Sequence, residues 1–280
     1  MPGHRRSTAT SPEPEPRHPM RPNHHRSLFL SDLHLGALGC RADLVRDFLE
    51  KNTADQIFLV GDILDIWHPL AINWGPVQDQ ILEILRQRAA EGAELVYLIG
   101  NHDYELTKMD SCPQIPARLC REYSHRAADG RLFLILHGDI CDSRMFRWHI
   151  WTRIGSRIDS LLRSADRGLR SLRRSLRPED RTPIEWAIAK LNEVLYAGQA
   201  HERRLIELAR RTGHDGVVCG HFHVSALHSD HGLIYANCGD WVDSFTAIAE
   251  DADGRLHMLG GREVLRAGRP APDLLAGEVA

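Results

Sequence analysis

The chain has 280 residues, of which 42% are hydrophobic, and its formal net charge is −3. This size and composition predict one large globular domain, or one domain with an insertion, and exclude a general polyanion-binding protein. No run approaches the roughly 18 apolar residues of a membrane span. No apolar core follows the N-terminal arginines, so we expect no secretory signal. The six cysteines form no C-x-x-C pair. We expect them to be buried free thiols, which favours a reducing compartment.

The first hundred residues predict an alternation of strands and helices. Residues 1–26 are rich in Pro, Arg, His and Ser, so we expect a disordered tail, with ordered structure from Ser27. Short apolar runs predict strands at 28–30, 57–60 and 95–99, and apolar residues at helical spacing predict helices over 41–52 and 76–91. This β-α-β-α-β order predicts parallel strands with right-handed crossovers, whose carboxyl ends gather ligands.

The pattern changes after a further apolar run at 132–136. Residues 143–212 contain no convincing strand, and we interpret 143–200 as a helical insertion that covers one side of a site. Short strands are predicted again at 216–219, 226–228, 233–236, 246–249 and 256–259, as a second, largely antiparallel sheet. Residues 262–280 are expected to form a flexible tail, which leaves 27–261 as the domain.

Five polar motifs follow apolar runs, so each lies where a predicted strand ends. They are Asp32-Leu33-His34, Gly61-Asp62, Gly100-Asn101-His102-Asp103, His137-Gly138-Asp139 and Gly220-His221-Phe222-His223. Each motif alone is also compatible with an ordinary turn. Because every motif contains a side chain able to bind a metal, their joint occurrence predicts a metal site.

The motifs supply seven candidate ligands with mixed nitrogen and oxygen donors: Asp32, His34, Asp62, Asn101, His137, His221 and His223. Side chains two residues apart on extended backbone point the same way, so Asp32 and His34 are expected to hold one cation. The His221 and His223 pair repeats this spacing. Seven ligands are too many for one tetrahedral zinc ion, whereas the carboxylate of Asp62 can bridge two cations. The donor mixture favours Mn²⁺, Fe²⁺ or Zn²⁺ over Mg²⁺, and we expect two Mn²⁺ ions.

Two neighbouring cations suit phosphoester hydrolysis, because they neutralise the charge that spreads over the phosphoryl oxygens. His102 is not needed as a ligand and is the candidate catalytic residue, able to give a proton to the leaving oxygen. With Asn101 it would also bind substrate. Asp65, Asp103 and Asp139 closely follow candidate ligands, and we expect them to orient imidazoles through hydrogen bonds.

The five motifs resemble those of calcineurin-like metallophosphoesterases, D-x-H, G-D, G-N-H-[DE], H and G-H-x-H, and every position is met. The resemblance implies an α/β fold in which two sheets form a sandwich flanked by helices. It implies that one metal is held by Asp32, His34, Asp62 and His223. It implies that the other is held by Asp62, Asn101, His137 and His221, with His102 as the catalytic histidine.

A closer resemblance runs from about Ser27 to Leu259, to bacterial UDP-2,3-diacylglucosamine diphosphatases and their relatives. It rests on four segments, 31–36, 61–67, 137–139 and 237–242, which read SDLHLG, GDILDIW, HGD and NCGDWV. It implies that the pyrophosphate of a nucleotide-linked lipid is hydrolysed to UMP and a lipid-bearing sugar phosphate, in lipid A synthesis. The best-known members have Arg where this chain has His102.

Two other functions stay open. One is a phosphodiesterase or phosphatase that acts on another nucleotide, a nucleic acid or another phospholipid. The second is a non-catalytic binding module, which the absence of a candidate ligand or of His102 would favour. All seven candidate ligands and His102 are present in this chain.

Residues 141–181 hold eleven arginines and five acids, interleaved with Trp, Ile and Leu. This composition is typical of basic amphipathic helices on an anionic membrane surface, which 143–181 would contact. It is equally typical of a helical cap whose apolar face packs on the core. We therefore expect a cytoplasmic protein, peripheral on the inner membrane under the first hypothesis. Nucleic-acid binding is disfavoured, because the pI is about 6.6 and no aromatic stacking platform is evident.

Overall fold

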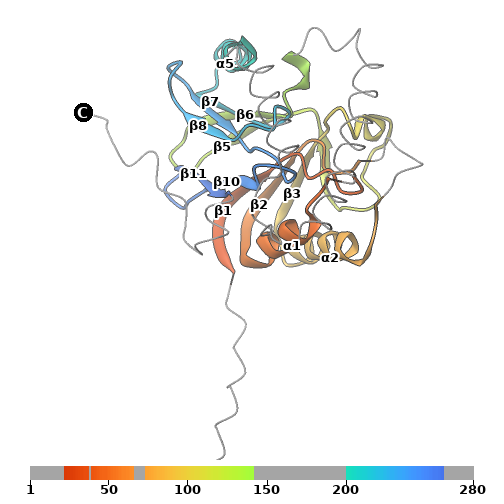
Figure 1. The fold of residues 1–280 in the computed structure, drawn as a ribbon. Coiled ribbons are helices and arrows are strands. Elements are labelled where there is room, and N and C mark those ends of the chain that lie inside the picture. The colour runs from red at the N-terminus through yellow and green to blue at the C-terminus, as the bar shows by residue number, and fades with distance from the viewer. Residues whose placement is uncertain (1–21, 38, 66–72, 142–199, 262–280) are drawn as a thin grey trace, which may run out of the picture.

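A computed structural model describes residues 22–37, 39–65, 73–141 and 200–261. Two β-sheets pack face to face, helices α1 and α2 cover the outer face of the first sheet, and α5 covers the outer face of the second (Figure 1). This confirms the predicted α/β sandwich flanked by helices. The predicted insertion at 143–200 lies outside the described residues, apart from Ala200, with which α5 begins.

The first sheet contains the predicted alternation of strands and helices. Its elements in this part of the chain are β1 (Asn23–Leu30), α1 (Ala42–Lys51), β2 (Asn52–Val60), α2 (Pro76–Ala90), β3 (Glu94–Leu98) and β4 (Arg118–Cys120). β1, β2 and β3 are parallel neighbours, because each helix returns the chain to the end where the previous strand began. Both predicted helices are confirmed, and Val45 of α1 and Ile81 of α2 are buried against this sheet.

β1 begins earlier than the sequence predicts, at Asn23 rather than near Ser27. The polar residues Asn23, His24 and His25 pair in register with Asn52, Thr53 and Ala54 of β2. Backbone hydrogen bonds to a neighbouring strand do not depend on apolar side chains, so composition alone does not reveal this extension. The expectation of disorder is therefore wrong for 23–26, and residues 1–21 lie outside the described part of the chain.

The second sheet is mixed rather than largely antiparallel, which corrects the prediction. Its strands are β5 (Glu122–Arg126), β6 (Leu132–Leu136), β7 (Gly216–Cys219), β8 (Ala226–His228) and β9 (Ile234–Asn237). Their order is β5-β6-β7-β9-β8, and β6, β7 and β9 run parallel. Two strands predicted here, β10 (Thr246–Glu250) and β11 (Leu256–Gly260), instead extend the first sheet, where β10 pairs antiparallel with β1. Short apolar runs do not show which neighbour they pair with.

Apolar side chains fill three layers: between the first sheet and α1 and α2, between the two sheets, and between the second sheet and α5. The layer between the sheets includes Phe29 and Phe58, whose rings stack with centroids 4.8 Å apart. β2, β6 and β7 each end directly before one of the five motifs, and β1 and β3 end one residue earlier than that. The packed sheets therefore hold all five motifs at the carboxyl ends of these strands.

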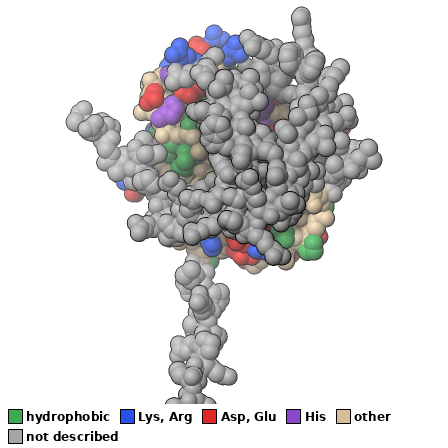
Figure 2. All heavy atoms as spheres, viewed as in Figure 1, with side chains coloured by type: hydrophobic (Ala, Val, Ile, Leu, Met, Phe, Trp, Pro, Cys, Tyr) green, Lys and Arg blue, Asp and Glu red, His purple; other side chains and the backbone are tan. Residues whose placement is uncertain are grey.

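The outer surface of α5 (Ala200–Arg211) is charged. Arg210 and Arg211 both pair with Glu207, and acidic and basic side chains lie together over this helix at the top of Figure 2. Two short 3-10 helices, η1 (Tyr104–Lys108) and η2 (Asp139–Cys141), follow the third and fourth motifs. Within the described residues, no helix is both long and apolar enough to span a membrane.

Candidate metal centre

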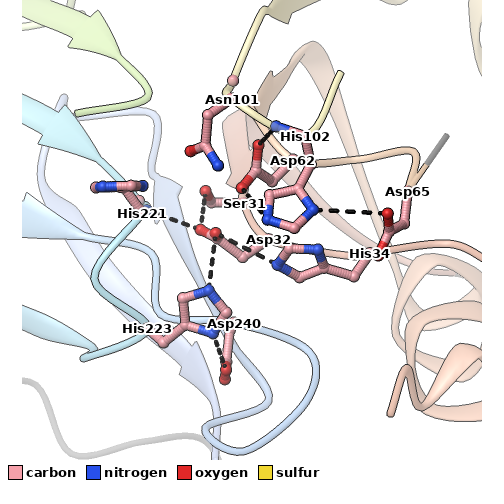
Figure 3. A network of polar contacts seen from close by, with 12 residues as sticks. Ser31, Asp32, His34, Asp62, Asp65, Asn101, His102, His221, His223 and Asp240 are labelled. Carbon is pink, nitrogen blue, oxygen red and sulfur yellow. Dashed lines mark hydrogen bonds and ion pairs between the residues drawn. The ribbon is translucent and has the colours of Figure 1, made fainter. Parts of the chain in front are cut away.

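Polar side chains from four of the five strand exits lie face to face in Figure 3. His137, from the remaining exit, lies 3.2 Å from Asn101. Three groups of side chains place their ligand atoms within 4.8 Å of one another. They are Asp32, His34 and His223; Asp62, His137 and His221; and His34, Asp65 and His102. The first two groups contain six of the seven predicted ligands, and they combine residues from both sheets.

The first group is centred on Asp32, which is fully buried. Its Oδ1 lies 3.3 Å from Nε2 of His223 and 3.8 Å from Nε2 of His34. Its Oδ2 accepts hydrogen bonds from the hydroxyl of Ser31 and from the backbone N–H of His221, at 2.9 Å in the second case. One oxygen is thus held by the protein, while the other faces the two imidazoles.

The second group is centred on Asp62, which is 2% exposed. Its Oδ2 lies 3.3 Å from Nε2 of His137, and its Oδ1 accepts a hydrogen bond from the backbone N–H of His102 at 2.8 Å. Nε2 of His137 also lies 3.2 Å from Oδ1 of Asn101, while its Nδ1 lies 3.0 Å from the carbonyl oxygen of Val60. The seventh predicted ligand, Asn101, therefore belongs to this side of the site.

The backbone at these motifs is left-handed rather than extended, which corrects the expected geometry. φ is +53° at Asp32, +47° at His34, +54° at Asp62, +69° at His221 and +56° at His223. Asp, Asn and His adopt this region more readily than other non-glycine residues, at a cost of about 1–2 kcal/mol each. His221 and His223, two residues apart, face different groups, whereas Asp32 and His34 share one.

Glycines allow the motif loops to approach one another closely. A Cβ atom at Gly100 would collide with Oδ1 of Asp62, and one at Gly220 would collide with the hydroxyl of Ser31. Glycine at these two positions therefore lets the loops of different strands pack side by side, which larger residues would prevent.

The carboxylates create a strongly negative environment. Burial alone would raise the pKa of Asp62, but the imidazoles of His137 and His102 outweigh it and hold that pKa well below its usual value. Burial alone would lower the pKa of His137, but the carboxylates of Asp62 and Asp32 raise it to about 10. A place that captures a proton so readily is one in which a metal cation is also stabilised.

Two other imidazoles are neutral, which is the form that binds a metal. Burial, helped by the neighbouring His102, lowers the pKa of His34 to about 4, and burial together with His137 lowers that of His221 to about 3. Nε2 of His34 is buried and makes no hydrogen bond to any described residue. Because an unpaired buried nitrogen is costly, this atom fits a metal ligand well.

His102 lies beside both groups without belonging to either. Its Nδ1 is 3.5 Å from Oδ1 of Asp65, and its Nε2 is 4.0 Å from Oδ2 of Asp62. Burial would lower the pKa of His102, but Asp62 and Asp65 outweigh it and raise that pKa. Asp65, which was predicted to orient an imidazole, is therefore placed beside that of His102.

Asp103 makes different contacts from those predicted. Its carboxylate accepts hydrogen bonds from the backbone N–H of Ile63 at 3.1 Å, from that of Gly100, and from the hydroxyl of Tyr97 at 2.7 Å. It therefore joins the second and third motif loops, rather than orienting an imidazole. Within the described residues, no imidazole is found to donate a hydrogen bond to Asp139. Burial raises the pKa of the Asp139 carboxyl, and the charge of His137 opposes the rise.

Two residues that the sequence analysis quoted within the segments SDLHLG and NCGDWV, without a role of their own, support the first group. Oδ2 of Asp240 lies 2.7 Å from Nδ1 of His223, and Ser31 binds both Asp32 and the carbonyl oxygen of Val60. Gly239-Asp240 follows β9 after one residue, much as Gly61-Asp62 follows β2 directly, and this repeated pattern was the available signal for Asp240. For Ser31, only its place at the start of SDLHLG stands out.

Residues 25–225 match the family model described as calcineurin-like phosphoesterase. This match covers well over half of the chain, so the chain belongs to the calcineurin-like phosphoesterase family and is a phosphoester hydrolase.

Similar proteins carry a more specific name. A UDP-2,3-diacylglucosamine hydrolase of Neisseria meningitidis serogroup B is 26% identical over 255 residues, which cover 82% of this chain and 96% of that protein. One of Tolumonas auensis is 33% identical over 125 residues, which cover 40% of this chain and 46% of that protein. Among solved structures, an archaeal phosphodiesterase with 14% identity aligns with a TM-score of 0.43, over 83% of this chain and 98% of its own.

Proposed function

We propose that this chain is a dinuclear metal-dependent hydrolase of a nucleotide-linked lipid. Its substrate would be UDP-2,3-diacylglucosamine or a similar molecule, cleaved at the pyrophosphate to give UMP and a lipid-bearing sugar phosphate. The observation that carries the proposal is the presence of two adjoining ligand groups, centred on Asp32 and Asp62, in one site. The hydrolases from Neisseria and Tolumonas support the choice of substrate.

The candidate ligands would hold two divalent cations, most readily Mn²⁺. Asp32, His34 and His223 would hold one, Asn101, His137 and His221 would hold the other, and Asp62 would lie between them. Bound there, the cations would supply positive charge to the phosphoryl oxygens and lower the pKa of an attacking water.

His102 would complete the reaction as a general acid. As water forms a bond to phosphorus, the bond from phosphorus to the leaving oxygen breaks, and that oxygen needs a proton. Asp62 and Asp65 outweigh burial and raise the pKa of His102, which favours the protonated imidazole that a general acid needs, and the contact with Asp65 would orient the ring. Asn101 and His102 would also contact the substrate.

The substrate can be tested directly. Purified protein with Mn²⁺ should release UMP from UDP-2,3-diacylglucosamine, and a chelator should abolish the release. Hydrolysis of bis(p-nitrophenyl) phosphate without any UMP release from the lipid substrate would support a phosphodiesterase or phosphatase of different specificity. Metal binding without hydrolysis of either compound would support a binding module.

The arginine-rich segment 143–181 lies outside the described residues, and its contact with an anionic membrane is part of this proposal. Exchanging Arg163, Arg170, Arg173 and Arg174 for Gln should weaken sedimentation with vesicles that contain phosphatidylglycerol. Each basic residue near such a surface contributes about 1 kcal/mol, so four exchanges should have a large effect. Unchanged sedimentation would favour the helical cap with solvated arginines.

A further inference from the structure

Arg121 occupies a special place in the fold, as the single residue between β4 and β5. β4 is the last strand of the first sheet and β5 is the first strand of the second, so Arg121 joins the two sheets at their edges. Its neighbours Cys120 and Glu122 pair with Leu98 of β3 and Leu136 of β6. These are the last residues of their strands: Leu98 lies one residue before the third motif, with only Ile99 between, and Leu136 lies directly before the fourth.

This register places Arg121 beside one half of the candidate metal centre. The third motif supplies Asn101 and the fourth supplies His137, and these two side chains lie 3.2 Å apart. The backbone N–H of Ile99 also donates to the carbonyl oxygen of Cys120 at 2.9 Å, which ties the loop that carries Asn101 to the residue before Arg121. Both loops therefore leave the sheets next to this arginine.

The side chain of Arg121 is exposed and is held against a ring. Its Cζ atom lies 5.1 Å from the centroid of Tyr104, the first residue of η1, and Tyr104 comes two residues after His102. Such a cation–π contact limits the freedom of a long side chain without neutralising its charge. The guanidinium thus lies beside the third motif loop.

The charge of Arg121 is available for a ligand. Within the described part of the chain, no ion pair is found for it, whereas Lys108, at the end of η1, pairs with Glu105. A guanidinium beside a metal-binding edge matches the paired oxygens of a phosphate group.

We propose that Arg121, braced by Tyr104, binds a second anionic group of the substrate, next to the phosphoryl group that reacts. The substrate class would then be a compound with two adjacent phosphoryl groups, rather than a simple phosphodiester. The proposal rests on the phosphoester hydrolase activity of the family, and it adds a residue that selects among substrates.

The test compares two inhibitors that differ by one phosphoryl group. Orthophosphate and pyrophosphate are measured as competitive inhibitors of bis(p-nitrophenyl) phosphate hydrolysis, at a fixed concentration of free Mn²⁺. In the Arg121→Gln variant, the inhibition constant for pyrophosphate should rise about tenfold, because pyrophosphate loses one charge-assisted contact. The inhibition constant for orthophosphate and the kcat for the diester should stay within about twofold of wild type, because neither compound has a second phosphoryl group for this exposed charge to contact.

Matched variants separate this role from a structural one. Lys108→Gln removes a cation at the end of η1 that is already paired with Glu105, and it should change the inhibition constant of neither inhibitor. Tyr104→Phe keeps the ring and should behave as wild type, whereas Tyr104→Ala should weaken pyrophosphate alone, by less than Arg121→Gln. Arg121→Lys keeps the charge and should recover part of the pyrophosphate binding.

Two results would overturn the proposal: an unchanged inhibition constant for pyrophosphate in Arg121→Gln, or equal losses for both inhibitors. Equal losses would mean that Arg121 acts by shaping the site rather than by contacting a second phosphoryl group. The probes contain neither lipid nor nucleoside. A failure to cleave UDP-2,3-diacylglucosamine would therefore refute the proposed substrate and leave this test unaffected.

Discussion

At the scale of single residues, the contact between Asp240 and His223 decides which nitrogen faces the centre. Oδ2 of Asp240 holds Nδ1, so Nε2 points towards Asp32 (Figure 3). Mutation of a partner that orients a ligand imidazole in this way lowers metal affinity about 10–100-fold. The Asp240→Asn variant should lose affinity for Mn²⁺ by that factor, as measured by metal titration.

A control for this variant exists in the same chain. Asp251 makes a similar contact, 2.8 Å from Nε2 of His257, in the turn between β10 and β11 rather than at the motif edge. The Asp251→Asn variant should therefore keep the affinity of the wild type. If the two variants bound Mn²⁺ equally well, Asp240 would have no part in positioning a ligand.

His102 carries the second prediction at this scale. Its replacement by Ala should lower turnover at least about a hundredfold, because the leaving oxygen loses its proton donor. The metal content should not change, since the ligand groups centred on Asp32 and Asp62 do not need this side chain. His214→Ala, which alters an imidazole that contacts Ser124 and Thr212, is the control. A normal rate for His102→Ala would remove it from the mechanism.

At the scale of elements, Glu250 of β10 links the first sheet to the second. Its buried carboxylate accepts hydrogen bonds from Ser27 of β1 at 2.7 Å and from the backbone N–H of Ala128 at 2.8 Å, and it lies 2.6 Å from Nε2 of His125 in β5. Burial alone would raise the pKa of Glu250, but these contacts outweigh it and lower that pKa below 4.5. The folded chain therefore binds this proton less tightly than the unfolded chain.

The pH dependence of stability follows from that sign. The contribution of Glu250 is fully present above about pH 4.5, and it is lost as the pH falls through the lower pKa of the folded state. Glu250→Gln should lower the free energy of unfolding by about 2 kcal/mol at neutral pH. The difference from wild type should be smaller in acid, because protonation of Glu250 already removes part of this stabilisation from the wild-type protein. Urea unfolding at several pH values measures both. Parallel pH profiles for variant and wild type would contradict this role.

The strands also show which features a sequence reveals. α1 and α2 were predictable, because helical spacing is a local pattern within ten to fifteen residues. The position of β10 was not, because its partner β1 lies more than two hundred residues earlier in the chain. β4 and β5 were not predicted, because Arg118, Glu122 and Arg126 interrupt any apolar run.

The candidate site divides in the same way. Its candidate ligands could be named from the sequence because few residue types bind metals, and each follows a recognisable strand; the structure brings six of them into two groups. The left-handed backbone at Asp32 and His34 was not, because it follows from the packing of loops rather than from residue type. The roles of Asp240 and Asp103 likewise depend on partners brought close only by the fold.

At the scale of the whole molecule, the candidate ligands come from both sheets. Asp32, Asp62 and Asn101 follow strands of the first sheet, whereas His137, His221 and His223 follow strands of the second. The groups exist only when the sheets are packed together, so metal binding should stabilise the fold. At a free Mn²⁺ concentration of 100 times Kd, linkage predicts about 2.7 kcal/mol, visible as a rise in Tm in calorimetry. An identical Tm with Mn²⁺ and with chelator would contradict this coupling.

The central claim is that the five motifs hold two neighbouring cations. Elemental analysis of active protein, combined with anomalous scattering from its crystals, tests this most directly. We predict two ions per chain, about 3.5–4 Å apart, with Asp62 between them. One ion should lie among Asp32, His34 and His223, and the other among Asn101, His137 and His221. Fully active protein with a single ion, or with none, would contradict the claim.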